Sequence, residues 1–185
     1  MRLRLVLPDL EVPTPGGRSG GGASDDGAGS GKSSRLNLLL TYGGWREHAF
    51  ADQLPIILDR FGIQCYRAES GDEASDVIRR ARVHIAVIDL SIPMHPMSPQ
   101  ARAAGSRSVP AGPRVLQLLR RLEQPPPTIV VRPRQADESE SARTLMDALR
   151  DGAFCVLDDP VPIESMLQAL ERVVRRHYRD HWPAA

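Results

Sequence analysis

The chain has 185 residues, a formal net charge of +1 and 25% charged residues. This length is enough for one domain with a hydrophobic core and some residues in excess. The near-zero net charge does not favour attraction to nucleic acid. No apolar run reaches the roughly 20 residues that span a bilayer, and the apolar stretch at the N-terminus is too short for a secretory signal. We therefore expect a cytoplasmic protein that binds neither nucleic acid nor a membrane.

The N-terminal part of the chain differs in composition from everything after it. Residues Pro13–Ser34 are nearly all Gly, Ser, Ala, Pro and Asp, with no large apolar side chain. Such a segment cannot bury enough surface to offset the entropy lost on ordering. The composition predicts a disordered tail over residues 1–34 and a folded domain over residues 35–181.

The folded part is predicted to begin with a strand, a helix and a second strand. The apolar run Leu36–Thr41 predicts a buried strand, and turn residues follow it. Residues Trp45–Phe61 carry apolar side chains at helical spacing. Because Pro55 lies within this segment, we expect either a kink or a later start near Ala51. Residues Ile63–Ala68 predict the second strand.

A short helix, a third strand and a long loop are predicted next. The helix covers Ser70–Arg80, with Ser70 as its N-cap and Glu73 at the spacing of a capping box. Residues Ile85–Leu90 are apolar except for one carboxylate, and this pattern predicts a buried strand. Residues Ser91–Gly112 are rich in Pro, Ser, Ala and Gly. A loop of this length inside a compact domain is usually functional or disordered.

The remaining segments continue the alternation of helix and strand. They are a helix over Pro113–Glu123, a strand over Thr128–Val131, a helix from Ser139 or Glu140 to Asp151, a strand over Phe154–Leu157 and a helix from Pro162 to about His177. Such alternation implies right-handed βαβ crossovers. The sequence therefore predicts an α/β domain with a doubly wound, five-stranded parallel sheet and five helices in three α/β/α layers.

Asp89 is the most informative residue of the chain. It stands near the end of the third apolar run, and Pro93 follows four residues later. In open parallel sheets, ligands and chemistry collect at the carboxyl ends of the strands. Asp89 is therefore predicted to lie where such a fold places its functional site.

Three segments, taken in order, resemble the receiver domain of two-component response regulators over roughly Leu36–Arg176. Val87–Pro93 looks like the phospho-acceptor segment, in which an apolar strand ends in Asp. Gly112–Leu122 looks like the third helix of the family, and Gly152–Pro160 resembles its last strand with the proline that follows. The resemblance implies a flavodoxin-like fold, a role in phosphorelay signal transduction, and Asp89 at the phospho-acceptor position.

The resemblance also implies a pocket of defined chemistry around the acceptor. The family uses an acidic pair after strand one to hold a divalent cation, a Ser or Thr at the end of strand four, and a Lys after strand five. These groups neutralise the repulsion between a carboxylate and a phosphoryl donor. At the corresponding positions this chain has Thr41, Tyr42 and Gly43 for the acidic pair, Arg132 for the Ser or Thr, and Asp159 for the Lys, between Asp158 and Pro160.

These departures predict a degenerate pocket. Asp89 alone would hold Mg²⁺ poorly, because this ion needs several oxygen ligands at short distance. We therefore expect no cofactor and no ordinary phosphorylation. Two facing carboxylates either raise each other's pKa or recruit a cation. Arg132 is the available cation, and it is predicted to pair with Asp89, Asp159 or both and to occupy the phosphate site permanently. The alternative is a receiver that still accepts a phosphoryl group on Asp89 from a histidine kinase, with an unusual Mg²⁺ arrangement.

The expected function is that of a stand-alone, receiver-like signalling protein with no enzymatic activity. It would act by docking onto a histidine kinase, another signalling protein or a second copy of itself. The resemblance implies that a homodimer would use the face formed by the fourth helix, the fifth strand and the last helix. The candidate interface residues on this face are Arg143, Leu145, Met146, Asp147, Leu149, Arg150, Glu171 and Arg172.

Overall fold

The computed structural model describes residues 36–42, 50–98, 100, 109–133 and 138–179. The chain divides into two units, Met1–Gly31 and Lys32–Ala185, and every described residue belongs to the second. The predicted tail over residues 1–34 lies outside the described residues and stays a prediction. No helix in the described part of the chain is long and apolar enough to cross a membrane.

Five parallel strands form one sheet in the order β2-β1-β3-β4-β5. Each helix that connects two successive strands runs back over one face of the sheet, so the fold is doubly wound. This arrangement confirms the predicted fold class. The strands are β1 (Leu36–Thr41), β2 (Ile63–Ala68), β3 (Ile85–Asp89), β4 (Thr128–Arg132) and β5 (Ala153–Asp158).

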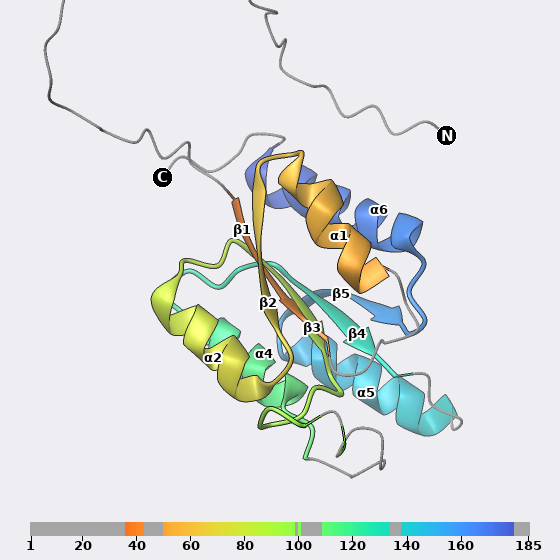
Figure 1. Ribbon diagram of the computed structural model, residues 1–185. Helices are drawn as coiled ribbons and strands as arrows, with labels where there is room; N and C mark the ends of the chain where they lie inside the picture. Colours follow the sequence, from red (N-terminus) through yellow and green to blue (C-terminus); the bar gives the residue numbers. More distant parts are fainter. Residues whose placement is uncertain (1–35, 43–49, 99, 101–108, 134–137, 180–185) are drawn as a thin grey trace, which may run out of the picture. The chain divides into compact units, whose positions relative to one another are not determined.

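The helices cover both faces of this sheet (Figure 1). α1 and α6 pack on one face, and α2, α4 and α5 pack on the other. The helices are α1 (Phe50–Asp59), α2 (Gly71–Arg80), α4 (Gly112–Arg120), α5 (Glu138–Arg150) and α6 (Ile163–Tyr178).

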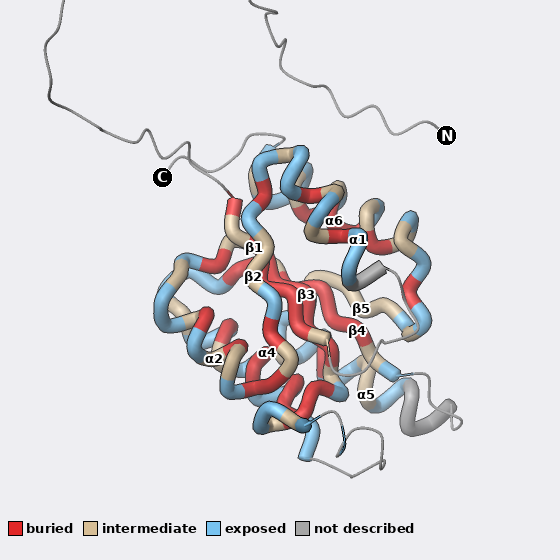
Figure 2. The backbone as a smooth tube through the Cα atoms, viewed as in Figure 1, coloured by how far each residue is buried: buried red, intermediate tan, exposed pale blue. Residues whose placement is uncertain are grey.

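The core lies on both sides of the central strands, which Figure 2 shows as the most continuously buried part of the chain. Successive side chains of a strand point to opposite faces. Leu38 and Leu40 therefore pack with α1 and α6, whereas Leu39 packs with α2 and α4. β3 is buried at every position, including Asp89 at its end. A strand buried on both faces explains the continuous apolar run in the sequence.

Some boundaries differ from the sequence-based expectation. α1 is described from Phe50 and contains Pro55, and residues 43–49 lie outside the described part, so the kink or later start that Pro55 suggested stays a prediction. α4 ends at Arg120 instead of Glu123, because the Leu122 N–H bonds back to the Leu119 carbonyl and tightens the last turn. β5 is longer than expected at both ends and takes in Asp158.

The predicted loop over residues 91–112 is anchored at both ends. Pro93 and Pro110 form an antiparallel bridge, and the Ala111 N–H donates to the Ile92 carbonyl at 2.8 Å. We call these two paired segments, Ile92–Met94 and Pro110–Ala111, the loop stem. Ile92 and Ala111 are fully buried, so the stem is part of the core, while residues 99 and 101–108 lie outside the described part.

The loop stem also completes the N-terminus of α2. The N–H groups of Gly71 and Asp72 donate to the carbonyls of Pro93 and Met94, at 2.9 and 3.1 Å. These donors have no partner within their own helix. The Ser70 hydroxyl accepts the Glu73 N–H at 3.2 Å, which confirms the predicted N-cap.

A hydrogen-bonded cluster joins α6 to the edge of the sheet where β1 and β3 begin, opposite the edge that contains Asp89. The Asn37 N–H donates to His84 Nδ1 at 2.9 Å, and the Tyr178 hydroxyl donates to the His84 carbonyl at 2.5 Å. His84 can accept through Nδ1 only as the neutral imidazole. Burial, and then the nearby Arg82 charge, lower the pKa of His84 below its usual value.

We predict that His84 makes the stability of the fold depend on pH. Because its pKa is lower in the folded chain, the stabilisation is complete above the unfolded value of about 6.5 and is lost as the pH falls below it. His84→Asn keeps an acceptor near the Nδ1 position and does not titrate. Urea unfolding of both proteins between neutral and mildly acidic pH should show the wild type losing more stability than the variant. A difference between them that stays constant with pH would contradict the prediction.

Candidate functional site

Asp89 is buried at the carboxyl end of β3, with 1% of its surface exposed. Its N–H donates to the Thr41 hydroxyl at 2.8 Å, and that hydroxyl lies 3.4 Å from the Val87 carbonyl, to which it donates. Thr41 is also fully buried. It therefore joins the ends of β1 and β3, at a position where the resemblance places a metal-binding carboxylate.

The carboxylate of Asp89 is engaged by its own chain two residues later. Both the N–H and the hydroxyl of Ser91 donate to Asp89 Oδ1, at 2.8 and 2.7 Å. An Asp that bonds the backbone two residues on forms an Asx turn. The sequence prediction did not include Ser91, although the Asp-x-Ser spacing is the signal that would have identified it.

Arg132 places a cation at the end of the neighbouring strand. Its side chain is 12% exposed, and Nε donates to Asp158 Oδ1 at 2.5 Å. The two residues are register partners at the ends of β4 and β5. Asp158 was predicted to lie in the pocket but was not predicted to be the partner of Arg132. The predicted pairing with Asp89 or Asp159 stays a prediction.

A second cation lies at the other flank of the site, beside Tyr42. The Tyr42 hydroxyl donates to Glu69 Oε1 at 2.8 Å and accepts from Arg67 at 2.5 Å. Arg67 also pairs with Asp52 at 3.0 Å, and its guanidinium carbon lies 4.8 Å from the centre of the Tyr42 ring. Burial and the bond to Glu69 raise the pKa of Tyr42, which keeps its hydroxyl protonated at neutral pH. Gly43 lies outside the described residues.

The described residues bring Thr41, Asp89, Arg132, Asp158, Asp159 and Pro160 to one edge of the sheet. Within this described part, no group of three His, Cys, Asp or Glu side chains is arranged to hold a metal ion. Of the carboxylates at this edge, Asp158 pairs with Arg132 and Asp52 pairs with Arg67, while Glu69 accepts a hydrogen bond from Tyr42.

The position of Asp89 depends on two glycines that allow close packing. A Cβ added to Gly112, at the start of α4, would lie 2.4 Å from Leu90 Cα and 2.5 Å from the Asp89 carbonyl oxygen. A Cβ added to Gly71, at the start of α2, would lie 2.6 Å from Ala111 Cβ. The starts of both helices are thus in direct contact with the segment that follows β3.

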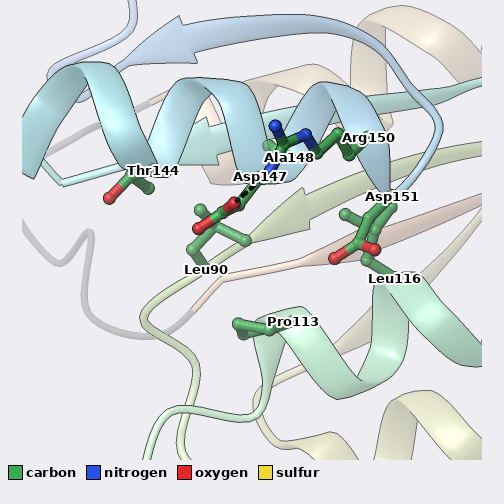
Figure 3. Close-up of a pocket in the computed structure, with 8 residues that line it drawn as sticks. All are labelled: Leu90, Pro113, Leu116, Thr144, Asp147, Ala148, Arg150 and Asp151. Atoms are coloured by element: carbon green, nitrogen blue, oxygen red, sulfur yellow. Dashed lines mark ion pairs between the residues drawn. The ribbon is translucent and has the colours of Figure 1, made fainter.

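The predicted interface residues of α5 point in different directions. Figure 3 shows Asp147 and Arg150 lining a cavity of about 410 Å³ between α4 and α5, opposite Pro113. All four residues are exposed: the side chains of Asp147 and Arg150 are 58% and 75% exposed, and Met146 and Leu149 are 52% and 45% exposed.

The other candidates differ in exposure. Arg143 and Arg172 are exposed, whereas Leu145 and Glu171 are half-buried. Of the three apolar residues predicted for the interface, Met146 and Leu149 are exposed and Leu145 is not. The use of this face in a dimer stays a prediction.

No protein-family model matches the sequence, and no curated protein matches it. Solved structures do match it. A signal receiver domain from Vibrio parahaemolyticus gives a TM-score of 0.57 at 16% identity, over 79% of this chain and 95% of that chain. A CheY-like response regulator receiver domain from Methanospirillum hungatei gives 0.56 at 18% identity, over 79% and 99%. The chain has the fold of response regulator receiver domains.

A third receiver-fold match was solved in a phosphorylated form. It is a response regulator from Burkholderia pseudomallei with a phosphorylated aspartic acid, a calcium ion and citrate. Its TM-score is 0.50 at 23% identity, over 78% of this chain and 74% of that chain. At these identities the matches establish the receiver fold, and the chemistry of the site has to be argued from the residues of this chain.

We predict that Gly112→Ala destabilises the receiver fold by roughly 1–3 kcal/mol, the usual cost of overpacking. The added methyl group meets backbone atoms, which cannot move without shifting β3. The only severe contact of a methyl group at Gly71 is with Ala111 Cβ, at 2.6 Å, so Gly71→Ala combined with Ala111→Gly should recover most of the stability lost by Gly71→Ala alone. Urea unfolding midpoints measure both effects. A Gly112→Ala protein as stable as the wild type would show that the close approach does not constrain the site.

Proposed function

We propose that this chain is a receiver-like signalling protein that acts by docking onto a protein partner and does not accept a phosphoryl group on Asp89. The observation that carries the proposal is the state of the Asp89 carboxylate. Its Oδ1 accepts two hydrogen bonds from Ser91, and Thr41 and Tyr42 stand where the receiver family has its metal-binding carboxylates. A buried carboxylate that accepts these hydrogen bonds has a structural role at the end of β3.

The metal-binding positions support the same proposal. Mg²⁺ is usually held by one or two carboxylates together with waters and phosphate oxygens. The Thr41 hydroxyl is already engaged with the backbone of β3, and the Tyr42 hydroxyl is engaged with Glu69 and Arg67. Neither residue offers a carboxylate, so little remains near Asp89 to fix the cation that phosphoryl transfer needs.

The charges opposite Asp89 also support it. A phosphoryl group carries negative charge and requires positive or neutral surroundings. The family's lysine position is held by Asp159, whose N–H donates to the Arg132 carbonyl at 2.9 Å. The Arg132 side chain is bound to Asp158. An incoming phosphoryl group would therefore meet a second carboxylate and an arginine that already has an anionic partner.

Signalling without phosphorylation requires a docking surface. We propose the face of α5, β5 and α6, where Met146 and Leu149 are exposed and Arg143 and Arg172 supply charge. The occupant of this face would be a histidine kinase, another signalling protein or a second copy of the chain. Apolar side chains surrounded by charged ones are typical of protein–protein contacts.

Phosphorylation can be tested directly on the full chain. The protein is incubated with Mg²⁺ and a small phosphodonor such as acetyl phosphate, and its intact mass is measured without delay. We expect no mass increase for the wild type. A gain equal to one phosphoryl group that Asp89→Asn abolishes would overturn the proposal and support the phosphorylated alternative.

A matched variant shows whether the altered pocket residues are the cause. Thr41→Asp, Tyr42→Asp, Arg132→Thr and Asp159→Lys together supply the groups that the receiver family uses. We expect this variant, once shown by circular dichroism to be folded, to gain the mass of one phosphoryl group under the same conditions. A folded variant that stays unmodified would show that other features of this chain prevent phosphoryl transfer.

A further inference from the structure

The doubly wound fold places the C-terminal ends of all its helices at the edge of the sheet where the strands begin. We call this the amino edge and define it as the last turn of each helix with the residues that follow. Exposed arginines predominate there, over the acidic residues Asp59, Glu123, Asp147 and Asp151. The arginines are Arg60, Arg79, Arg80, Arg82, Arg120, Arg121, Arg150, Arg175, Arg176 and Arg179. Among them, Arg79, Arg120 and Arg150 pair with Asp76, Asp151 and Asp147.

The opposite edge, where the strands end, has the opposite charge. We call it the carboxyl edge and define it as the strand ends with the first turn of each helix. Among the described side chains of this edge, the arginines are Arg67 and Arg132, which pair with Asp52 and Asp158, and Arg114. The acidic residues among these described side chains are the buried Asp89 together with Asp52, Glu69, Asp72, Glu73, Asp158, Asp159 and Glu164.

The separation of charge between the two edges arises from all the helices together. Each basic residue in a last turn and each acidic residue in a first turn complements the dipole of its own helix. Because all the helices run in the same direction, these local preferences add up to two edges of opposite sign. The net charge of the whole chain stays at +1 and its isoelectric point near 7.9. A nucleic-acid-binding domain typically has an isoelectric point above about 9, so the charge pattern favours a partner that carries both signs.

The two edges also carry matching apolar features. At the amino edge, a cavity of about 320 Å³ lies between the ends of α2 and α4, lined by Ile78, Ala81, Val83 and Leu122, with Arg82 and Glu123 on its rim. At the carboxyl edge, Val109 adjoins the loop stem and is 71% exposed. An exposed apolar side chain thus lies at the edge that carries the acidic groups, and a hollow lined in part by apolar side chains lies among the arginines of the other edge.

We propose that the chain associates head to tail with a second copy, the amino edge of one protomer seated on the carboxyl edge of the next. Val109 enters the hollow between α2 and α4, and the arginines around that hollow meet the acidic groups near the start of α2. Such a contact uses two different surfaces, so it continues to further copies as a ring or a filament. Val109 and the hollow lie outside the α5–β5–α6 face proposed for docking, whereas Asp147 and Arg150 belong both to the candidate residues of that face and to the amino edge.

Sedimentation velocity of the full chain tests this proposal. The monomer has a mass of 20.3 kDa. At low salt we expect the mass to rise with protein concentration through dimers to larger species. Raising the salt to 1 M shortens the Debye length to about 3 Å, which should return most of the protein to monomer. A mass that stays at the monomer value at all concentrations would overturn the proposal.

Two charge-reversed variants make the test specific. Arg80→Glu with Arg121→Glu reverses two charges beside the hollow at the amino edge, and Asp72→Lys with Glu164→Lys reverses two charges at the carboxyl edge. Each should stay monomeric alone at low salt, and an equimolar mixture should form complexes containing both. A mixture that stays monomeric while the wild type associates would assign the association to another surface.

Val109→Ser provides an independent variant, because it removes the apolar side chain without adding charge and this exposed side chain contributes little to the core. We expect it to weaken association at least tenfold while the unfolding midpoint stays unchanged. Wild-type affinity in this variant would overturn the proposed contact. Assembly that stops at a dimer and is lost in Met146→Glu would assign the interface to the α5–β5–α6 face and also overturn it, as would binding of the wild-type monomer to heparin, a polyanion, without self-association.

Discussion

The packing of Gly112 directly against the backbone of Asp89 and Leu90 is the constraint on which the rest of the site depends. The start of α4 rests on the end of β3 with no side chain between them. This contact fixes where the central strand ends, and the bond from the Asp89 N–H to Thr41 fixes the end of β1 beside it. The carboxyl edge is therefore rigid at its centre, even though a long loop leaves from the same point.

The retained scaffold and the altered site chemistry have the same physical origin. The groups that hold the strand ends together are those at the positions of catalytic groups in the receiver family. The Thr41 hydroxyl accepts the Asp89 N–H, Ser91 donates to the Asp89 carboxylate, and Arg132 binds across to Asp158. In the function that we propose, these hydrogen bonds and ion pairs take the place of those that a metal ion and a phosphoryl group would make.

The sequence was sufficient to predict the sheet, because strands buried on both faces give long apolar runs that are hard to mistake. It was also sufficient to place Asp89 at the carboxyl edge and Arg132 and Asp158 near it. It was not sufficient to predict which carboxylate Arg132 would bind, since Asp158 and Asp159 are adjacent and strand register decides between them. Ser91 and Arg67 were missed because their roles depend on turn geometry and on contacts between strands, which periodicity does not report.

The loop stem has a consequence for the order in which the chain can fold during synthesis. The N-terminus of α2 receives its hydrogen-bond acceptors from Pro93 and Met94, which leave the ribosome after the helix itself. Until β3 and the stem have been made, the first turn of α2 has only the Ser70 cap. Nascent α2 therefore remains incomplete until the middle of the domain is available. The completion of this early helix is thus tied to the closing of the later loop.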